Sequence, residues 1–304
     1  MLSFIFPGQG SQYAGMGKDL ADQFAVARRT FEEADEALGF ALSRLCFEGP
    51  EDDLKLTENT QPAILATSIA ALRVLRQERD LTPAFVAGHS LGEFSALVCA
   101  GGLDFADALR TVRLRGQFMQ QAVPVGVGAM AAIIGLDAPD VESVCASACG
   151  AEIVSPANFN SPGQVVIAGH AGAVERAIEL AREKGAKRAL PLPVSAPFHC
   201  PLMVPAGERL AGVLAALSYG DLQVPVVTNV EARANSRSER IAELLVAQVS
   251  APVRWQESVE YMAAQGVTRF IEIGPGKVLA GLVKRIAKSV EVGNLEDSAG
   301  LHKI

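Results

Sequence analysis

The sequence predicts an α/β protein in which a mostly parallel sheet is covered by helices on both faces. Short apolar stretches typical of strands, such as residues 2–6 and 84–87, alternate with helical segments along most of the 304 residues. This alternation is typical of a parallel sheet with crossover helices. Between residues 125 and 194 the order changes to β-α-β-β-α-β, the order of a ferredoxin-like unit. We therefore expect a body formed by residues 1–124 and 195–304, with residues 125–194 inserted as a small subdomain.

The first half of the body is expected to begin with a buried strand that ends at Pro7 and Gly8, because this pair favours a tight loop. Apolar residues at helical spacing define the helices that follow, and Asp104 is a typical N-cap residue. The expected strands cover residues 2–6 and 84–87, and the expected helices cover residues 18–38, 60–79, 91–100 and 104–121.

The inserted subdomain and the second half of the body follow from the same patterns. In the subdomain we expect strands over residues 128–134, 152–156, 164–168 and 188–194, helices over 139–148 and 171–184, and a turn over 158–163. After it the alternation resumes, with helices over residues 202–217, 239–249, 256–265 and 277–288 and strands over 224–229 and 268–273.

Composition excludes several classes of function. With 27 basic and 34 acidic side chains the net charge is −7, which argues against broad nucleic-acid binding. The five cysteines form no C-x-x-C pair, so neither a disulfide framework nor a cysteine-rich zinc site is expected. The N-terminus lacks the basic segment of a signal peptide, and the longest uncharged run, residues 116–136, is too short in its apolar part to span a bilayer. We expect a soluble cytoplasmic protein.

Glycine pairs do not support a nucleotide site. None of the three Gly-x-Gly pairs continues into G-x-G-x-x-G, and neither Gly-Lys pair belongs to a phosphate-binding loop.

The segment Gly88-His-Ser-Leu-Gly92 matches the pattern G-x-S-x-G, with a predicted strand before it and a predicted helix after it. This is the context of a nucleophile elbow, in which glycines allow a strained and crowded turn. Ser90 would then be exposed at a helix N-terminus, where the N–H of Leu91 can stabilise an oxyanion. The alternative is an ordinary strand-to-helix turn in which the serine only caps the helix.

A nucleophilic serine needs a base, and the chain has only four histidines. His89 is adjacent to Ser90, and side chains of neighbouring residues diverge on a sharp turn. His170 follows a strand of the small subdomain, and His302 is close to the C-terminus, where chains often fray. His199, in a loop bracketed by prolines, is therefore the best candidate, although an isolated loop histidine is often incidental.

Several ordered motifs extend beyond this pair. They are Phe6-Pro-Gly-Gln-Gly-Ser-Gln12, Thr60-Gln-Pro-Ala63, Gly88-His-Ser-Leu-Gly-Glu93, Arg113-Leu-Arg-Gly116, Asn158-Phe-Asn-Ser-Pro-Gly-Gln164, Pro197-Phe-His199, Gln248 and Glu272-Ile-Gly-Pro-Gly-Lys277. Through them nearly the whole chain resembles the malonyl-CoA:acyl carrier protein transacylase family of bacterial fatty acid synthesis. The resemblance implies a hydrolase-like α/β body with an inserted ferredoxin-like subdomain.

The same resemblance implies the roles of the site residues. Ser90 would be the nucleophile and His199 the base, with the main-chain carbonyl of Gln248 orienting the imidazole. The N–H groups of Gln9 and Leu91 would form the oxyanion hole. No metal or redox cofactor is implied.

Two substrate-binding residues depend on the resemblance more than on the pattern. Helical spacing alone leaves Arg113 and Arg115 as alternatives on opposite flanks of an apolar stripe, where an arginine is usually a surface residue. The family pattern selects Arg115, whose planar guanidinium would bind the free carboxylate of malonate. Phe198, before the histidine, would narrow the pocket against an α-methyl group; the alternative is a residue that only packs under its own loop.

The implied reaction moves malonyl from malonyl-CoA to the phosphopantetheine thiol of acyl carrier protein through a malonyl-serine, and we expect a monomer. Basic clusters at residues 184–188 and 284–288 are candidates for docking the acidic carrier, or are simply solvated helix ends. Three rival functions stay open at this point: a serine thioesterase or other hydrolase, a carrier-binding module without catalysis, and an acyltransferase of polyketide synthesis.

Overall fold

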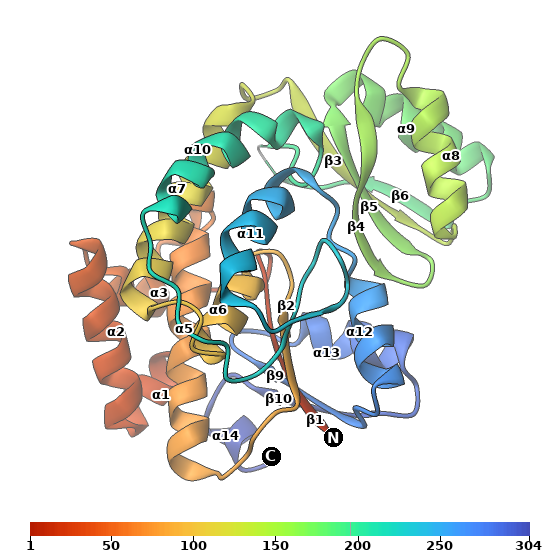
Figure 1. Cartoon of the computed structure of the whole chain (residues 1–304). Coiled ribbons are helices and arrows are strands. Elements are labelled where there is room, and N and C mark those ends of the chain that lie inside the picture. The colour runs from red at the N-terminus through yellow and green to blue at the C-terminus, as the bar shows by residue number, and fades with distance from the viewer. Residues whose placement is uncertain (195) are drawn as a thin grey trace.

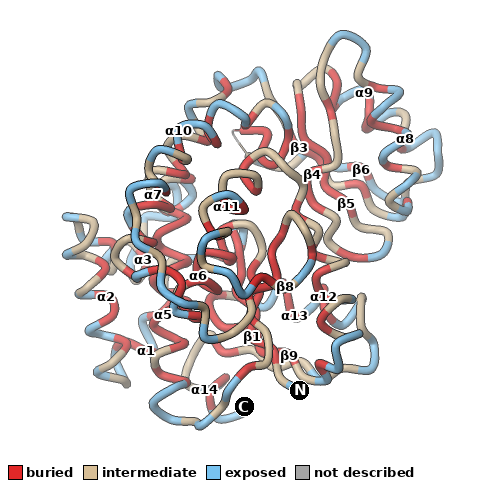
Figure 2. Tube along the Cα trace, in the orientation of Figure 1, coloured by how far each residue is buried: buried red, intermediate tan, exposed pale blue. Residues whose placement is uncertain are grey.

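The protein consists of a large α/β body and a smaller unit at one side of it (Figure 1). The structure is a computed structural model that describes residues 1–194 and 196–304. Buried segments concentrate in the strands and on the inward faces of the helices (Figure 2).

A six-stranded sheet forms the centre of the body. Its strand order is β10-β9-β1-β2-β7-β8, and every neighbouring pair is parallel except β7 and β8. The strands are β1 (Leu2–Phe6), β2 (Phe85–Gly88), β7 (Val226–Val227), β8 (Ala234–Asn235), β9 (Arg269–Ile273) and β10 (Glu291–Leu295). The mostly parallel sheet predicted from the alternation of elements is therefore confirmed.

Helices cover both faces of this sheet, because alternate residues of each strand point to opposite sides. Phe4, Phe6 and Val86 belong to an apolar cluster shared with α5 and α7, whereas Ile5 and Ala87 belong to a second cluster shared with α12 and α13. The helices of the body are α1 (Lys18–Gln23), α2 (Ala25–Leu38), α3 (Leu42–Glu48), α4 (Glu51–Leu54), α5 (Thr57–Glu78), α6 (Gly92–Cys99), α7 (Phe105–Ala122), α10 (Val204–Ala215), α11 (Ile241–Ser250), α12 (Trp255–Ala264), α13 (Val278–Ile286) and α14 (Ser298–Leu301), with short 3₁₀ turns η1 (Pro201–Met203) and η2 (Ser238–Arg240).

The smaller unit has its own sheet and its own apolar core. The sheet order is β4-β5-β3-β6 with all neighbours antiparallel, which is the ferredoxin-like arrangement. Its elements are β3 (Gly128–Ile134), α8 (Ala138–Ala148), β4 (Val154–Ser161), β5 (Gln164–His170), α9 (Ala171–Glu183) and β6 (Arg188–Pro191). A separate cluster of buried side chains lies between this sheet and the two helices. We propose on this basis that residues 125–194 are an inserted subdomain; its predicted end adjoins residue 195, which lies outside the described residues.

Several predicted boundaries are wrong. The helix predicted over residues 18–38 is interrupted at Phe24, whose backbone is extended, and the strand predicted over 224–229 has only two paired residues. The turn predicted over 158–163 is shorter, because β4 continues to Ser161 and pairs with β5. Asn158 also bridges to Val253 of the body, and this second partner holds the polar segment in a strand. The short elements α3, α4, α14, β8 and β10 were not predicted.

Among the described residues, no helix combines the length and the apolar character that crossing a bilayer requires.

Candidate active site

The turn between β2 and α6 is strained at Ser90, whose φ of 51° lies in the left-handed region. Both flanking glycines are sterically required. A Cβ on Gly88 would lie 1.9 Å from the carbonyl carbon of Gly92, and a Cβ on Gly92 would lie 2.1 Å from the carbonyl oxygen of Phe6. The predicted elbow is therefore present, and it holds Ser90 at the carboxyl edge of the parallel sheet.

His199 is the histidine that faces Ser90. Its Nε2 lies 2.7 Å from Ser90 Oγ, and its Nδ1 lies 2.9 Å from the main-chain oxygen of Gln248. Because a carbonyl oxygen only accepts, Nδ1 carries the proton and Nε2 is free to accept one from the serine. The imidazole is almost completely buried, with 4% of the His199 surface exposed. This geometry is that of a nucleophile and base oriented by a third group.

The other three histidines have different surroundings. His89 Nε2 lies 2.8 Å from Asn160 Oδ1, and the His89 ring lies near Trp255. His170 Nδ1 accepts a hydrogen bond from the Ile153 amide. His302 is exposed and follows α14, whose N-terminus is capped by Asp297. His302 therefore lies outside the group of residues around Ser90.

The surroundings of His199 keep it neutral. Burial, together with the positive charge of Arg115, lowers the pKa of His199 from 6.5 to about 3, although the bond to Gln248 opposes this shift. A neutral imidazole is the form that acts as a base.

A direct consequence is the pH dependence of serine acylation. Because only the protonated imidazole is inactive as a base, we expect the acylation rate to stay level from neutral pH down to about pH 4 and to fall by half near pH 3. Rapid-quench measurements of the first turnover across this range test the prediction. An acid limb centred near 6.5, the ordinary histidine value, would contradict it.

Arg115 of α7 is also buried, with 1% of its surface exposed, and its guanidinium points at the nucleophile. Nη2 donates to Ser90 Oγ at 3.1 Å and to Gln248 Oε1 at 3.0 Å, while Nη1 donates to Gln61 Oε1 at 2.8 Å. In the described part of the chain its Nε has no partner. Arg113 instead stacks over the ring of Phe40 at 4.1 Å, so of the two alternatives only Arg115 lies at Ser90.

Two backbone N–H groups lie at the same edge of the sheet. Leu91 is the N-cap residue of α6, and Gln9 follows β1, which pairs in parallel with β2 so that Phe6 lies opposite Gly88. Within the described residues neither amide donates a hydrogen bond to another protein group. Phe198 precedes His199 and is buried against the main apolar cluster.

Three polar residues of the site had no role assigned from the sequence. Asn229, which follows β7, accepts from the Ser90 amide at 2.7 Å through Oδ1 and donates to the Gly88 carbonyl at 2.7 Å through Nδ2. Glu93 accepts from the Asn229 amide, and Gln61 holds Arg115. The position of Asn229 at the end of a predicted strand was the available signal, but only the strand order places it beside β2.

A strained serine next to a neutral histidine, on a mostly parallel sheet, is typical of enzymes that transfer acyl groups through a serine ester. The chain belongs to the acyl transferase family, because the model of the acyl transferase domain matches residues 3–303.

Similar proteins are malonyl CoA-acyl carrier protein transacylases of bacteria. The protein of that name from Escherichia coli K12 is 53% identical over 299 residues, which cover 98% of this chain and 97% of the relative. The Bacillus subtilis protein is 53% identical over 297 residues, covering 97% and 93%.

Solved structures of this kind have the same fold. An acyl carrier protein S-malonyltransferase from Vibrio cholerae superposes with a TM-score of 0.98 at 55% identity over 99% of both chains. A malonyl-transacylase solved in complex with a type II PKS acyl-carrier protein superposes with a TM-score of 0.97 at 51% identity, covering 99% of this chain and 98% of that one.

Proposed function

We propose that this acyltransferase moves a malonyl group from malonyl-CoA to the phosphopantetheine thiol of an acyl carrier protein through an ester on Ser90. The observation that carries the proposal is the position of Ser90 Oγ, which lies 2.7 Å from the base His199 and 3.1 Å from the guanidinium of Arg115. One contact supplies a nucleophile, and the other supplies a cation for a substrate with a free carboxylate. The family and the names of the relatives support the same reaction.

In the first half-reaction His199 Nε2 takes the Ser90 proton as Oγ attacks the thioester carbonyl carbon. The negative charge that develops on the carbonyl oxygen is stabilised by the N–H groups of Gln9 and Leu91. The carbon–sulfur bond then breaks, coenzyme A leaves as a thiol with the proton from His199, and malonyl-serine remains. The Gln248 carbonyl holds the imidazole in the required tautomer throughout, which is the main task of the third member in a triad.

The second half-reaction reverses these steps with a different thiol. His199 takes the proton of the phosphopantetheine thiol, whose sulfur attacks the malonyl-serine carbonyl. The ester bond breaks, and the proton returns to Ser90 Oγ. Each proton and bond in this scheme is supplied by Ser90, His199 and the two thiols, so the proposal includes no cofactor.

Arg115 would bind the free carboxylate of malonate. Its terminal nitrogens are held by the neutral side-chain oxygens of Gln61 and Gln248, so its charge stays available to a substrate anion. A planar guanidinium also matches the geometry of a carboxylate better than a lysine does. Phe198 would limit space beside the α-carbon of the acyl group. Of the basic clusters considered for carrier docking, Lys184 pairs with Asp140 at 2.8 Å, which fits a solvated helix end.

The test follows the acyl group through both half-reactions. After mixing the wild-type protein with malonyl-, methylmalonyl- or acetyl-CoA, intact mass and peptide mapping should show a malonyl ester on Ser90 as the main product. Adding carrier protein with its phosphopantetheine should move the malonyl group to that thiol. Release of free malonate instead would indicate a hydrolase, and the absence of any adduct would indicate a module without catalysis.

A further inference from the structure

Glu93 is a buried carboxylate that the proposed chemistry does not use. It lies in the first turn of α6, three residues after Ser90, and 1% of its surface is exposed. Its Oε2 accepts two hydrogen bonds of 2.9 Å, one from the Asn229 amide and one from Gln248 Nε2. Burial raises the pKa of Glu93 to about 7, against the effects of these bonds and of Arg115. Burying a carboxyl group is costly, so its presence beside the nucleophile requires a reason.

The first effect of Glu93 is on the side-chain amide of Gln248. Gln248 Nε2 faces three acceptors: Glu93 Oε2 at 2.9 Å, the Ser90 carbonyl at 3.0 Å and Asn229 Oδ1 at 3.4 Å. A flipped amide would place an oxygen against these three oxygens, and an NH₂ group against the guanidinium of Arg115. A carboxyl oxygen at this position therefore determines which end of the amide faces Arg115.

The second effect follows from the first. With its amide in this direction, Gln248 accepts from Arg115 Nη2 at 3.0 Å and keeps that nitrogen beside Ser90 Oγ. Among the described residues Arg115 forms no direct ion pair, and Glu93 acts on it through the intervening amide. A carboxylate in direct contact would occupy the donors that a substrate carboxylate needs.

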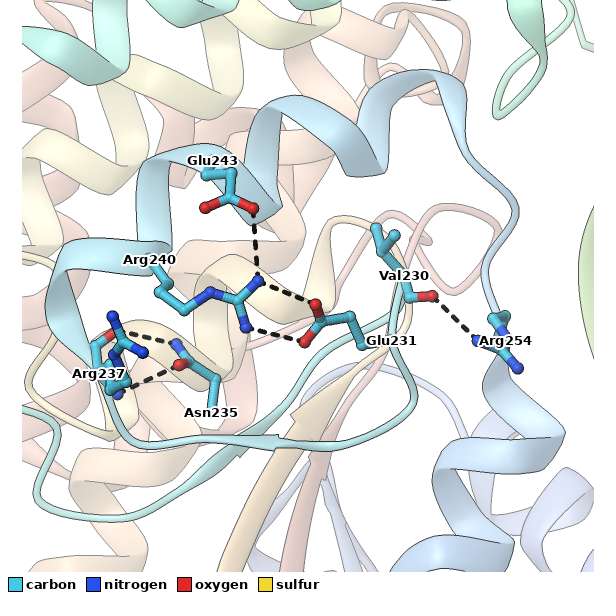
Figure 3. A network of polar contacts seen from close by, with 7 residues as sticks. All are labelled: Val230, Glu231, Asn235, Arg237, Arg240, Glu243 and Arg254. Atoms are coloured by element: carbon cyan, nitrogen blue, oxygen red, sulfur yellow. Dashed lines mark hydrogen bonds and ion pairs between the residues drawn. The ribbon is translucent and has the colours of Figure 1, made fainter.

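The other bond of Glu93 supports the elbow. It holds the amide of Asn229, whose side chain connects the Ser90 amide to the Gly88 carbonyl across the strained turn. The chain after Asn229 is in turn fixed to the segments just before and just after α11, the helix that carries Gln248. Glu231 and Arg240 form a double ion pair at 2.9 and 3.0 Å, and Arg254 donates to the Val230 carbonyl (Figure 3). These contacts help to hold Asn229 and Gln248 where both can donate to the same oxygen, Oε2 of Glu93.

We propose that Glu93 is a positioning residue that sets the acyl-group selectivity of the site: as a hydrogen-bond acceptor it orients the Gln248 amide, which holds Arg115 beside the nucleophile. The inference rests on the proposed function. Because both bonds end on Oε2, the acceptor role needs one oxygen and not a charge. A proton on the other oxygen leaves this role unchanged.

The experiment compares Glu93→Gln with Glu93→Ala. The amide oxygen of glutamine can take the position of Oε2 and accept both bonds, whereas alanine removes the acceptor and leaves buried donors without a partner. The quantities to measure are the ratio of malonyl to acetyl loading on Ser90, the KM for malonyl-CoA and kcat. The ratio depends on folded protein only, so partial unfolding does not change it. Glu93→Ala should lower the ratio about tenfold or more, mainly through KM, and Glu93→Gln should stay within about threefold of wild type.

Two results would overturn the inference: a wild-type ratio in Glu93→Ala, or a loss in Glu93→Gln as large as that in Glu93→Ala. If Glu93→Ala does not fold, Gln248→Ala can be used instead. This variant removes the side-chain amide that connects Glu93 to Arg115 and keeps the main-chain carbonyl that holds His199. It should lower the ratio equally, and an unchanged ratio would contradict the inference. A wild-type protein that forms no malonyl ester would instead overturn the proposed function itself, so the two failures are distinguishable.

Discussion

Alanine at Ser90 and alanine at His199 should each slow malonyl transfer to the carrier thiol by about 10⁴-fold or more, and the double variant should be no slower than either single one. The physical reason is the 2.7 Å contact between Ser90 Oγ and His199 Nε2. A serine hydroxyl is a weak nucleophile without its base, and the base has no substrate without the hydroxyl, so the two residues act as one unit. Their single losses are therefore not additive.

Single-turnover transfer assays and intact mass measure this effect separately for each variant. Ser90→Ala should show no acyl adduct with any coenzyme A ester, and His199→Ala should acylate only slowly. His302→Ala is the matched control, because this exposed histidine lies beyond α14 and should leave the rate unchanged. Losses that multiply in the double variant, or a persistent adduct in Ser90→Ala, would show that the two residues do not form the reacting pair.

The reacting pair could be predicted from the sequence because its signals are local. Two glycines around Ser90 indicate a turn too crowded for a Cβ, and the structure shows that both positions have no room for one. Elimination among four histidines then selects His199. Arg115 is an intermediate case, because helical spacing leaves it open against Arg113 and only the tertiary structure separates them. Arg113 stacks over the ring of Phe40, whereas Arg115 donates a hydrogen bond to Ser90 Oγ.

The residues that hold the Ser90 turn in place could not be predicted from local signals of this kind. Asn229 and Gln248 are separated from Ser90 by more than a hundred residues, and they meet it because β7 lies beside β2 and α11 follows β7. Periodicity indicates that strands exist, but it does not give their order in a sheet. The same limit explains the wrong turn over residues 158–163. Its Asn, Pro and Gly residues favour a turn, but pairing with β5 and with Val253 outweighs this local preference.

Alanine at Arg115 should reverse the preference of the enzyme for malonyl over acetyl groups. The variant loses the charge-assisted hydrogen bonds that the guanidinium would make to the malonate carboxylate, which is a loss of about 10²- to 10³-fold in kcat/KM for malonyl-CoA. Acetyl-CoA has no such carboxylate, so its loading should change much less. Removing the cation also removes one of the causes that lower the pKa of His199, so the acid limb of acylation should move to higher pH.

Competition between malonyl- and acetyl-CoA, followed by the mass of the acyl-enzyme, measures the selectivity directly. Arg113→Ala is the matched control on the same helix, because its guanidinium stacks over Phe40 and not beside Ser90. Arg115→Lys should recover little of the selectivity. A single ammonium group cannot donate to the side-chain oxygens of Gln61 and Gln248 and also to a substrate carboxylate in the fork geometry that these contacts impose. Equal selectivity in Arg115→Ala and wild type would remove Arg115 from substrate recognition. In that case the role of the buried Arg115 would be limited to its electrostatic effect on Ser90 and on the pKa of His199.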